Sequence, residues 1–208
     1  MQQQGSTLTN DAGKVFKAFQ APYHWYASAK RLRAAAELIL VAESPHEIPY
    51  LRAREDASEQ ASVSPAGTAE IQRLPPNYLP AQLLYAFALE NVFKGLIIAR
   101  APGLVDESRL SRAISSHNLV DLAQKAQISI ADLETRVLEA LSQLGEWAGR
   151  YPLPLRSEAD FISKGNPNTL MDYGSLHPTM RHVFDNALQA LEGLLPADTS
   201  EFEVVVAI

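Results

Sequence analysis

One long apolar stretch limits what this chain can fold into. Between residues 81 and 99 only four strongly polar side chains interrupt the apolar ones, and an arginine, an alanine and a Pro-Gly pair close the stretch at 100–103. This pattern predicts a helix over about 79–100, because Pro-Gly is a strong stop signal. A helix that is apolar nearly all round is buried. The polar residues argue against a membrane span. They are Gln82, Glu90, Asn91 and Lys94.

Apolar residues at three- and four-residue steps predict further helices at about 22–42, 117–126, 130–149 and 177–195. No segment alternates strongly enough for a β-sheet. The chain is therefore expected to be all-α, an up-and-down bundle of about five helices with long loops. The apolar residues that form this pattern are Trp25, Ala29, Leu32, Ala36 and Ile39 in the first helix; Leu133, Val137, Leu141, Leu144 and Ala148 in the fourth; and Val183, Leu188, Leu191 and Leu195 in the last. The predicted core is Leu84, Phe87, Ala88, Val92, Leu96, Leu141 and Leu144.

The connecting segments define the expected organisation. Residues 1–21 are polar and Gln-rich and are expected to form a loose arm before a bundle over 22–195, with a tail at 196–208. Residues 43–75 are rich in Ser, Ala, Pro and charge. They predict a long loop with one short helical piece around 50–60. Ser115 or Ser116 is the expected cap of the helix at 117, and Ser129 with Asp132 the expected start of the next one.

Composition excludes several classes of function. The chain has 208 residues, no cysteine and a formal net charge of −6. Disulfides, thiolate metal sites and cysteine nucleophiles are thus excluded, and a broad basic nucleic-acid surface is disfavoured. No glycine-rich phosphate loop occurs, and the five histidines lack metal-ligand spacing, so no cofactor or metal is expected. No signal peptide is visible, and a cytoplasmic protein is expected.

Glu90, Asn91 and Lys94 share one sector of the apolar helix. Four residues turn a helix by about 400°, which brings Glu90 and Lys94 about 40° apart. Burial of these groups costs free energy unless they are paired. The sector therefore either forms an i,i+4 ion pair at the bundle surface or lines a substrate-binding pocket.

Arg112 and His117 form an Arg-x4-His motif at a predicted helix start. A histidine in the first helical turn is favoured in its neutral form and can act as a general base. Arginine can hold a phosphate through two hydrogen bonds. These two groups suit cleavage of RNA by its own 2′-hydroxyl. The alternative is a capping histidine beside an unrelated surface arginine.

Arg150 and Tyr151 close the next helix before a Pro-Leu-Pro sequence. Arginine is favoured near a helix C-terminus, and the tyrosine ring can stack on a base or donate a hydrogen bond. The pair is a second candidate for substrate binding. Alternatively, it is a helix stop with a packed tyrosine.

Three segments in order resemble a known family. FALENVFKGLIIA, SHNLVDLA and EWAGRYPLP together resemble bacterial HEPN-domain proteins over about 79–156. The resemblance implies an all-helical bundle that pairs as a homodimer, and in many members a metal-independent ribonuclease with an Arg-x4–6-His motif. Arg112 and His117 match that motif at its shortest spacing. Ala113 departs from it, because a polar residue usually follows the arginine.

Two functions follow from these features. The first is a metal-independent endoribonuclease of toxin or defence type, with an antitoxin as a partner. His117 would be its base and Arg112 its phosphate clamp, with Glu90, Asn91 and Lys94 orienting them or the RNA. The second is a non-catalytic HEPN module that binds a nucleotide or a protein partner in the same cleft. The acidic net charge and Ala113 favour the second function, and the Arg112–His117 pair favours the first.

Overall fold

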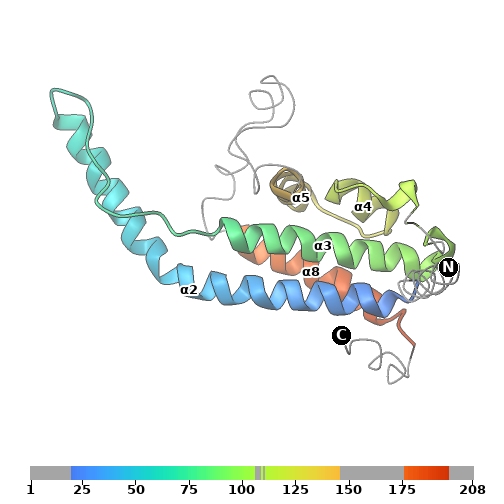
Figure 1. Ribbon diagram of the computed structural model, residues 1–208. Coiled ribbons are helices and arrows are strands. Elements are labelled where there is room, and N and C mark those ends of the chain that lie inside the picture. Colours follow the sequence, from blue (N-terminus) through green and yellow to red (C-terminus); the bar gives the residue numbers. More distant parts are fainter. Residues whose placement is uncertain (1–19, 106–108, 110, 146–175, 197–208) are drawn as a thin grey trace, which may run out of the picture.

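The computed structural model describes residues 20–105, 109, 111–145 and 176–196, and within these ranges it is an all-α bundle (Figure 1). The central helix α3 packs against α2 and α8 on one side and against α4 and α5 on the other. This arrangement confirms the predicted fold class. The α-helices are α2 (Pro22–Val63), α3 (Leu79–Arg100), α4 (Leu119–Lys125), α5 (Asp132–Gln143) and α8 (His177–Glu192), and the short 3-10 helices are η1 (Pro102–Leu104) and η2 (Arg112–Ile114).

Helix α3 has the bounds that its sequence predicts and forms the centre of the core. Its length and apolar character would allow it to cross a membrane, but 72% of its most apolar window is buried inside the bundle, as in a core helix. Five of the seven predicted core residues are buried, while Leu84 and Phe87 are only partly so. The five are Ala88, Val92, Leu96, Leu141 and Leu144.

Helix α2 corrects the predicted long loop over 43–75. The helix continues through Pro45 and Pro49 to Val63, so the loop prediction is wrong over 43–49 and 61–63, and the helical piece predicted around 50–60 is part of this one helix. A proline inside a helix removes one hydrogen bond and pushes away the carbonyl four residues earlier, which bends a helix without always ending it. Figure 1 shows the bend, after which α2 leaves the bundle. Near the bend, Glu43 accepts a hydrogen bond from the Asn77 backbone N–H at 2.8 Å.

Helix α4 begins at Leu119, two residues later than predicted, with Asn118 as its cap. The Asn118 Oδ1 accepts a hydrogen bond from the Asp121 N–H at 3.0 Å, so neither Ser115 nor Ser116 is the cap. The shift leaves His117 before the helix and outside its first turn. The prediction that His117 lies in the first turn of this helix is therefore wrong.

Helix α5 begins at Asp132, where the Glu134 carboxylate accepts a hydrogen bond from the Ala131 N–H at 2.7 Å. Within its predicted apolar line Val137 is buried, but Leu133 is 49% exposed. The α-helical part ends at Gln143, residues 144–145 continue as π-helix, and the predicted end at residue 149 lies outside the described residues. Helix α8 ends at Glu192 instead of residue 195. Ala148, residues 1–19 of the expected arm and the tail beyond residue 196 lie outside the described residues.

Candidate functional site

The Glu90 carboxylate on α3 joins two other candidate residues. Its Oε1 lies 2.7 Å from Lys94 Nζ, and its Oε2 lies 2.9 Å from His117 Nδ1. The Lys94 side chain is 5% exposed, that of Glu90 is 17% exposed, and that of His117 is 55% exposed. The predicted i,i+4 pair is therefore mostly buried, and the histidine connects it to solvent.

The Glu90 contact selects one form of the His117 ring. In a neutral imidazole one nitrogen carries the proton and the other accepts hydrogen bonds. A carboxylate only accepts, so the nitrogen that faces it, Nδ1, is the donor. The other nitrogen, Nε2, then keeps its lone pair. With the side chain more than half exposed, this arrangement suits a base that takes a proton from a bound molecule.

The backbone around His117 is held by polar contacts to α5. The Leu119 N–H donates to Ser142 Oγ at 2.9 Å, and the Ser142 hydroxyl donates to the Leu138 carbonyl at 2.7 Å. Next to the histidine, Ser116 Oγ accepts from the Asn118 N–H at 3.1 Å. The loop that carries His117 is thus anchored to the core, while the ring stays accessible.

Arg112 lies on the same loop but apart from this cluster. It starts η2 and is exposed, and within the described ranges no hydrogen bond or ion pair joins its side chain to Glu90, Lys94 or His117. The turn itself is fixed, because Lys125 Nζ donates to the Ala113 carbonyl at 2.8 Å. The Arg-x4-His motif is therefore one structured loop without direct contact between its two side chains.

Two other predicted site features do not join the cluster. The Asn91 amide donates to the Phe87 carbonyl of its own helix at 2.7 Å, a local bond that ties the side chain to the backbone. Arg150 and Tyr151 lie outside the described residues. Of the predicted site residues in the described part of the chain, the structure therefore brings together Glu90, Lys94 and His117.

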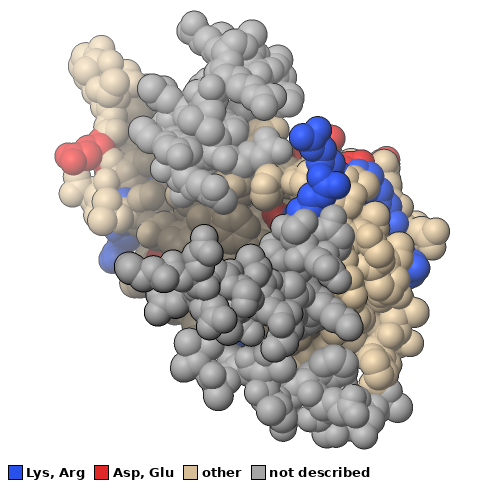
Figure 2. All heavy atoms as spheres, turned by 45° about the vertical axis from the view of Figure 1, so that its right-hand side comes forward, with Lys and Arg blue, Asp and Glu red and all other residues tan. Residues whose placement is uncertain are grey.

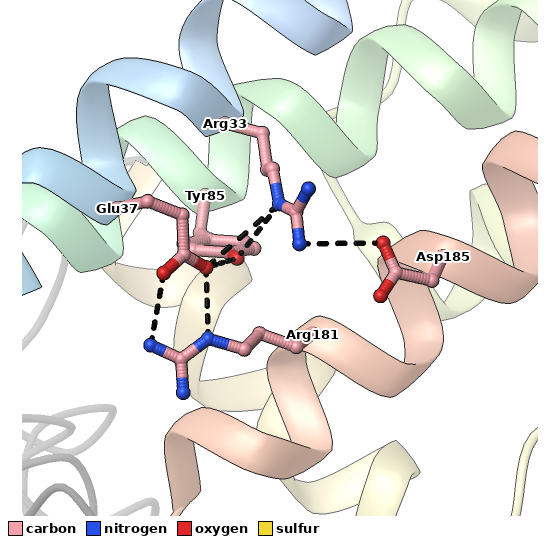
Figure 3. Close-up of polar contacts among 5 residues, drawn as sticks. All are labelled: Arg33, Glu37, Tyr85, Arg181 and Asp185. Carbon is pink, nitrogen blue, oxygen red and sulfur yellow. Dashed lines mark hydrogen bonds and ion pairs between the residues drawn. The ribbon is translucent and has the colours of Figure 1, made fainter.

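A second polar cluster, which the sequence did not predict, joins α2, α3 and α8 (Figure 3). Arg181 makes two hydrogen bonds to the Glu37 carboxylate, at 2.8 and 2.9 Å. The Tyr85 hydroxyl donates to the same carboxylate. Arg33 lies 3.5 Å from Asp185 and donates to the Tyr85 oxygen at 3.4 Å. Residues 144 positions apart are thus cross-linked through one carboxylate.

The ionisation of this second cluster follows from its contacts. Hydrogen bonds from Arg181 are the main cause that lowers the pKa of Glu37. Burial, followed by the bond to Glu37, raises the pKa of Tyr85 to about 12. The carboxylate is therefore charged and the phenol neutral near pH 7. The Glu37 carboxylate and the Tyr85 phenol are hydrogen-bonded to each other and to the arginines. The cluster therefore links three helices, and we call it the brace.

His177 is a buried histidine beside this brace. It is 5% exposed, and its Nε2 has no hydrogen-bond partner among the described residues. Its ring meets that of Tyr78 edge to face, with the centroids 4.5 Å apart. Burial is the main cause that lowers the pKa of His177 to about 4. The imidazole is therefore neutral at pH 7 and packs as an aromatic ring.

The surface at the α4 end carries both signs of charge. Figure 2 shows lysine and arginine side chains on this face with acidic side chains beside them. One such pair is Lys125 and Asp121, 2.8 Å apart. In the part of the chain that the structure describes, no group of three or more His, Cys, Asp or Glu side chains could hold a metal ion.

Comparison of the chain with protein-family models, with curated proteins and with solved structures finds no match. The chemistry of the cluster is thus the basis for assigning a function.

Proposed function

We propose that the chain is a metal-independent endoribonuclease that resembles the HEPN family, with His117 as its general base and Glu90 as the group that orients the base. The observation that carries the proposal is the 2.9 Å contact between Glu90 Oε2 and His117 Nδ1, with the histidine exposed. A base held by a second polar group is the arrangement that activates a weak nucleophile.

The proposed reaction needs one base and one cation. His117 Nε2 takes the proton of a ribose 2′-hydroxyl, and the 2′-oxygen forms a bond to the adjacent phosphorus. The bond from phosphorus to the 5′-oxygen breaks, and a water molecule protonates that oxygen while it takes up the proton held by His117, which restores the base. The products are a 2′,3′-cyclic phosphate and a 5′-hydroxyl. Arg112, exposed on the same loop, would stabilise the charge on the phosphate in the transition state.

Two observations support the alternative, a non-catalytic module that binds a nucleotide or a protein partner. Arg112 has no ion pair or hydrogen bond to Glu90, Lys94 or His117 within the described residues, and Ala113 follows it in place of the polar residue of the family pattern. In this alternative, the arginine and the histidine contact a phosphate without catalysis. Binding without cleavage distinguishes the two functions.

The proposal includes a homodimer. Leu38, Val41 and Ile48 lie on the part of α2 that runs up to and through the bend and are 75%, 68% and 56% exposed. They recur at three- and seven-residue steps, so they share one face of the helix. Large exposed apolar side chains on one face are typical of a protein–protein contact. Light scattering at micromolar concentration is expected to give twice 22.8 kDa, and a mass of one chain would contradict the dimer.

The test of the proposed function is incubation of the purified protein with a panel of RNAs, with and without chelator. His117→Ala is expected to lose about 10²- to 10⁴-fold in rate, and Arg112→Ala a comparable amount. Chelator should have no effect, and DNA of the same sequence should stay intact because it lacks the 2′-hydroxyl. Mass spectrometry should find 2′,3′-cyclic phosphate ends.

The matched controls are His46→Ala and Arg52→Ala, which remove an exposed histidine and an exposed arginine on α2. Both should cleave like the parent protein. The ribonuclease proposal fails if the parent leaves every RNA intact, or if His117→Ala cleaves at the parental rate. Calorimetry with mononucleotides then tests the alternative.

A further inference from the structure

Helix α2 carries an exposed apolar face that no described element covers. Leu38 and Val41 are 75% and 68% exposed, and three alanines beside them, Ala34, Ala35 and Ala42, are exposed as well. All five side chains fall within about 120° of the helix circumference. A continuous apolar face of this kind is typical of a contact with another segment of chain.

The described part of the chain ends near this face. Helix α8 runs antiparallel to α2 (Figure 1), and its last residue, Glu192, accepts a hydrogen bond from the Tyr26 hydroxyl at 2.6 Å. The chain therefore leaves α8 beside the N-terminal part of α2. Val41 lies about 22 Å along the helix from Tyr26, at 1.5 Å per residue. An extended segment 197–204 spans up to about 26 Å, so Val204 can reach Val41.

Residues 197–208, here called the tail, match this part of α2 in charge and in apolarity. The tail reads ADTSEFEVVVAI, with its acidic residues before its apolar run. On α2 the basic residue also comes first. Arg31 is exposed and makes no ion pair with a described residue, and Leu38 and Val41 follow about two to three turns later. A tail that runs along α2 in this direction places acidic residues near Arg31 and valines near Val41.

We infer that the tail binds along the exposed face of α2 in its own chain, with Asp198 and Glu201 near Arg31 and residues 204–206 on Leu38 and Val41. Because the tail is tethered, its effective concentration at the face is high. The proposed homodimer uses the same face, so a bound tail and a second copy exclude each other. The binding of the tail is independent of the proposed ribonuclease activity, and the competition rests on the proposed dimer.

Cross-linking in the full chain can locate the tail, because the chain has no cysteine. Ala42→Cys and Ala207→Cys together add one thiol on the face and one in the tail, and they leave the larger apolar side chains in place. A short bismaleimide should join the two thiols within one chain, which gives the mass of a single chain on a denaturing gel. A main product of twice that mass would show that the tail binds a second copy, and this would overturn the inference.

Leucine substitutions in the double-cysteine chain separate a bound tail from one that is only tethered. Leu38→Asn should lower the yield of the intrachain cross-link about 5-fold or more, because the tail loses an apolar contact. Leu133→Asn is the matched control, since it changes a leucine of α5 that is 49% exposed, and it should leave the yield unchanged. Equal yields in the two variants would overturn the inference.

Charge reversal tests the acidic part of the tail. Arg31→Glu should lower the cross-link yield about 2- to 5-fold at low salt, because it sets a carboxylate against the acidic residues of the tail. Arg136→Glu is the matched control, which reverses an exposed arginine on α5 and should not change the yield. If the two variants gave the same yield, the placement of the acidic residues near Arg31 would be wrong.

The dissociation constant of the dimer measures the competition. Val204→Ser/Val206→Ser weakens the tail contact without a change of charge. If tails cover about two thirds of the faces, their release should lower the constant about 10-fold, because both chains must expose the face. Val63→Ser, at a valine 83% exposed near the far end of α2, should leave it unchanged. Equal constants in the parent and the tail variant would overturn the competition. If both stay single chains, the dimer is contradicted, and the cross-link yields alone decide where the tail binds.

Discussion

Replacement of Gly95 by alanine tests how closely the three long helices meet. A Cβ atom built on Gly95 would lie 2.9 Å from Leu191 Cδ2 on α8 and 3.0 Å from Trp25 Cβ on α2. The leucine methyl can rotate away, but the tryptophan Cβ is fixed to its backbone, so α2 itself would have to move. Overpacking of this kind costs about 1–3 kcal/mol. Alanine is favoured over glycine inside a helix by about 0.5–1 kcal/mol.

The steric cost exceeds the gain in helix propensity, and we expect Gly95→Ala to lose about 1–2 kcal/mol of unfolding free energy. Urea unfolding followed by circular dichroism measures the change. Gly145→Ala is the matched control, because among the described residues its Cβ would meet Ala86 Cβ alone, at an ordinary 3.7 Å. This variant should be as stable as the parent or slightly more stable. If Gly95→Ala were as stable as Gly145→Ala, the close approach of α2, α3 and α8 would be refuted.

Three further predictions concern the core and the brace. Leu96→Ala should lose about 2–5 kcal/mol in urea unfolding, because Leu96 is fully buried and its truncation leaves a cavity; a loss near zero would contradict its place in the core. Tyr85→Phe should lose about 1 kcal/mol, because Glu37 loses one hydrogen-bond donor; a variant as stable as the parent would show that this bond contributes nothing. His177 has a folded-state pKa of about 4 against an ordinary 6.5, so its contribution to stability is complete above pH 6.5 and is lost as the pH falls toward 4, by up to roughly 3 kcal/mol. His177→Phe should flatten this part of the stability profile, and a profile as steep as the parent's would exclude His177 as its source.

The helices that the sequence predicts well are those whose signals are local. The bounds of α3 follow from its apolar stretch and its Pro-Gly stop. The α2 prediction was wrong because Pro45 and Pro49 are local stop signals, whereas the continuation depends on contacts with a distant segment. Tyr78, for example, donates to Glu47 at 2.8 Å across 31 positions. A local sequence pattern contains no information on such a distant contact. It therefore cannot show that the contact offsets the free-energy cost of a proline inside a helix.

The same distinction applies to the candidate site. The pair of Glu90 and Lys94 is predictable because four residues always bring two side chains onto one face of a helix. The contact of Glu90 with His117 spans 27 positions and depends on how the loop before α4 packs. The Arg-x4-His spacing suggested that Arg112 is a neighbour of His117. In a loop, however, the spacing of two residues does not determine where their side chains point. The bond between Glu37 and Arg181 spans 144 positions, and no periodic pattern in the sequence predicts it.

The burial of the site determines which variants can separate chemistry from folding. Lys94 and Glu90 are anchored on the central helix and mostly buried. Removal of Glu90 takes away the ion-pair partner of a buried ammonium, at a cost of about 3–5 kcal/mol when burial is complete, and removal of Lys94 leaves the Glu90 carboxylate with its contact to His117. Loss of activity in either single variant would therefore mix two effects. His117 is more than half exposed and lies before α4, where its side chain supports no packing in the core. If His117→Ala loses cleavage activity and keeps the urea midpoint of the parent, the loss of activity therefore reports the role of His117 as the base and not an effect on folding.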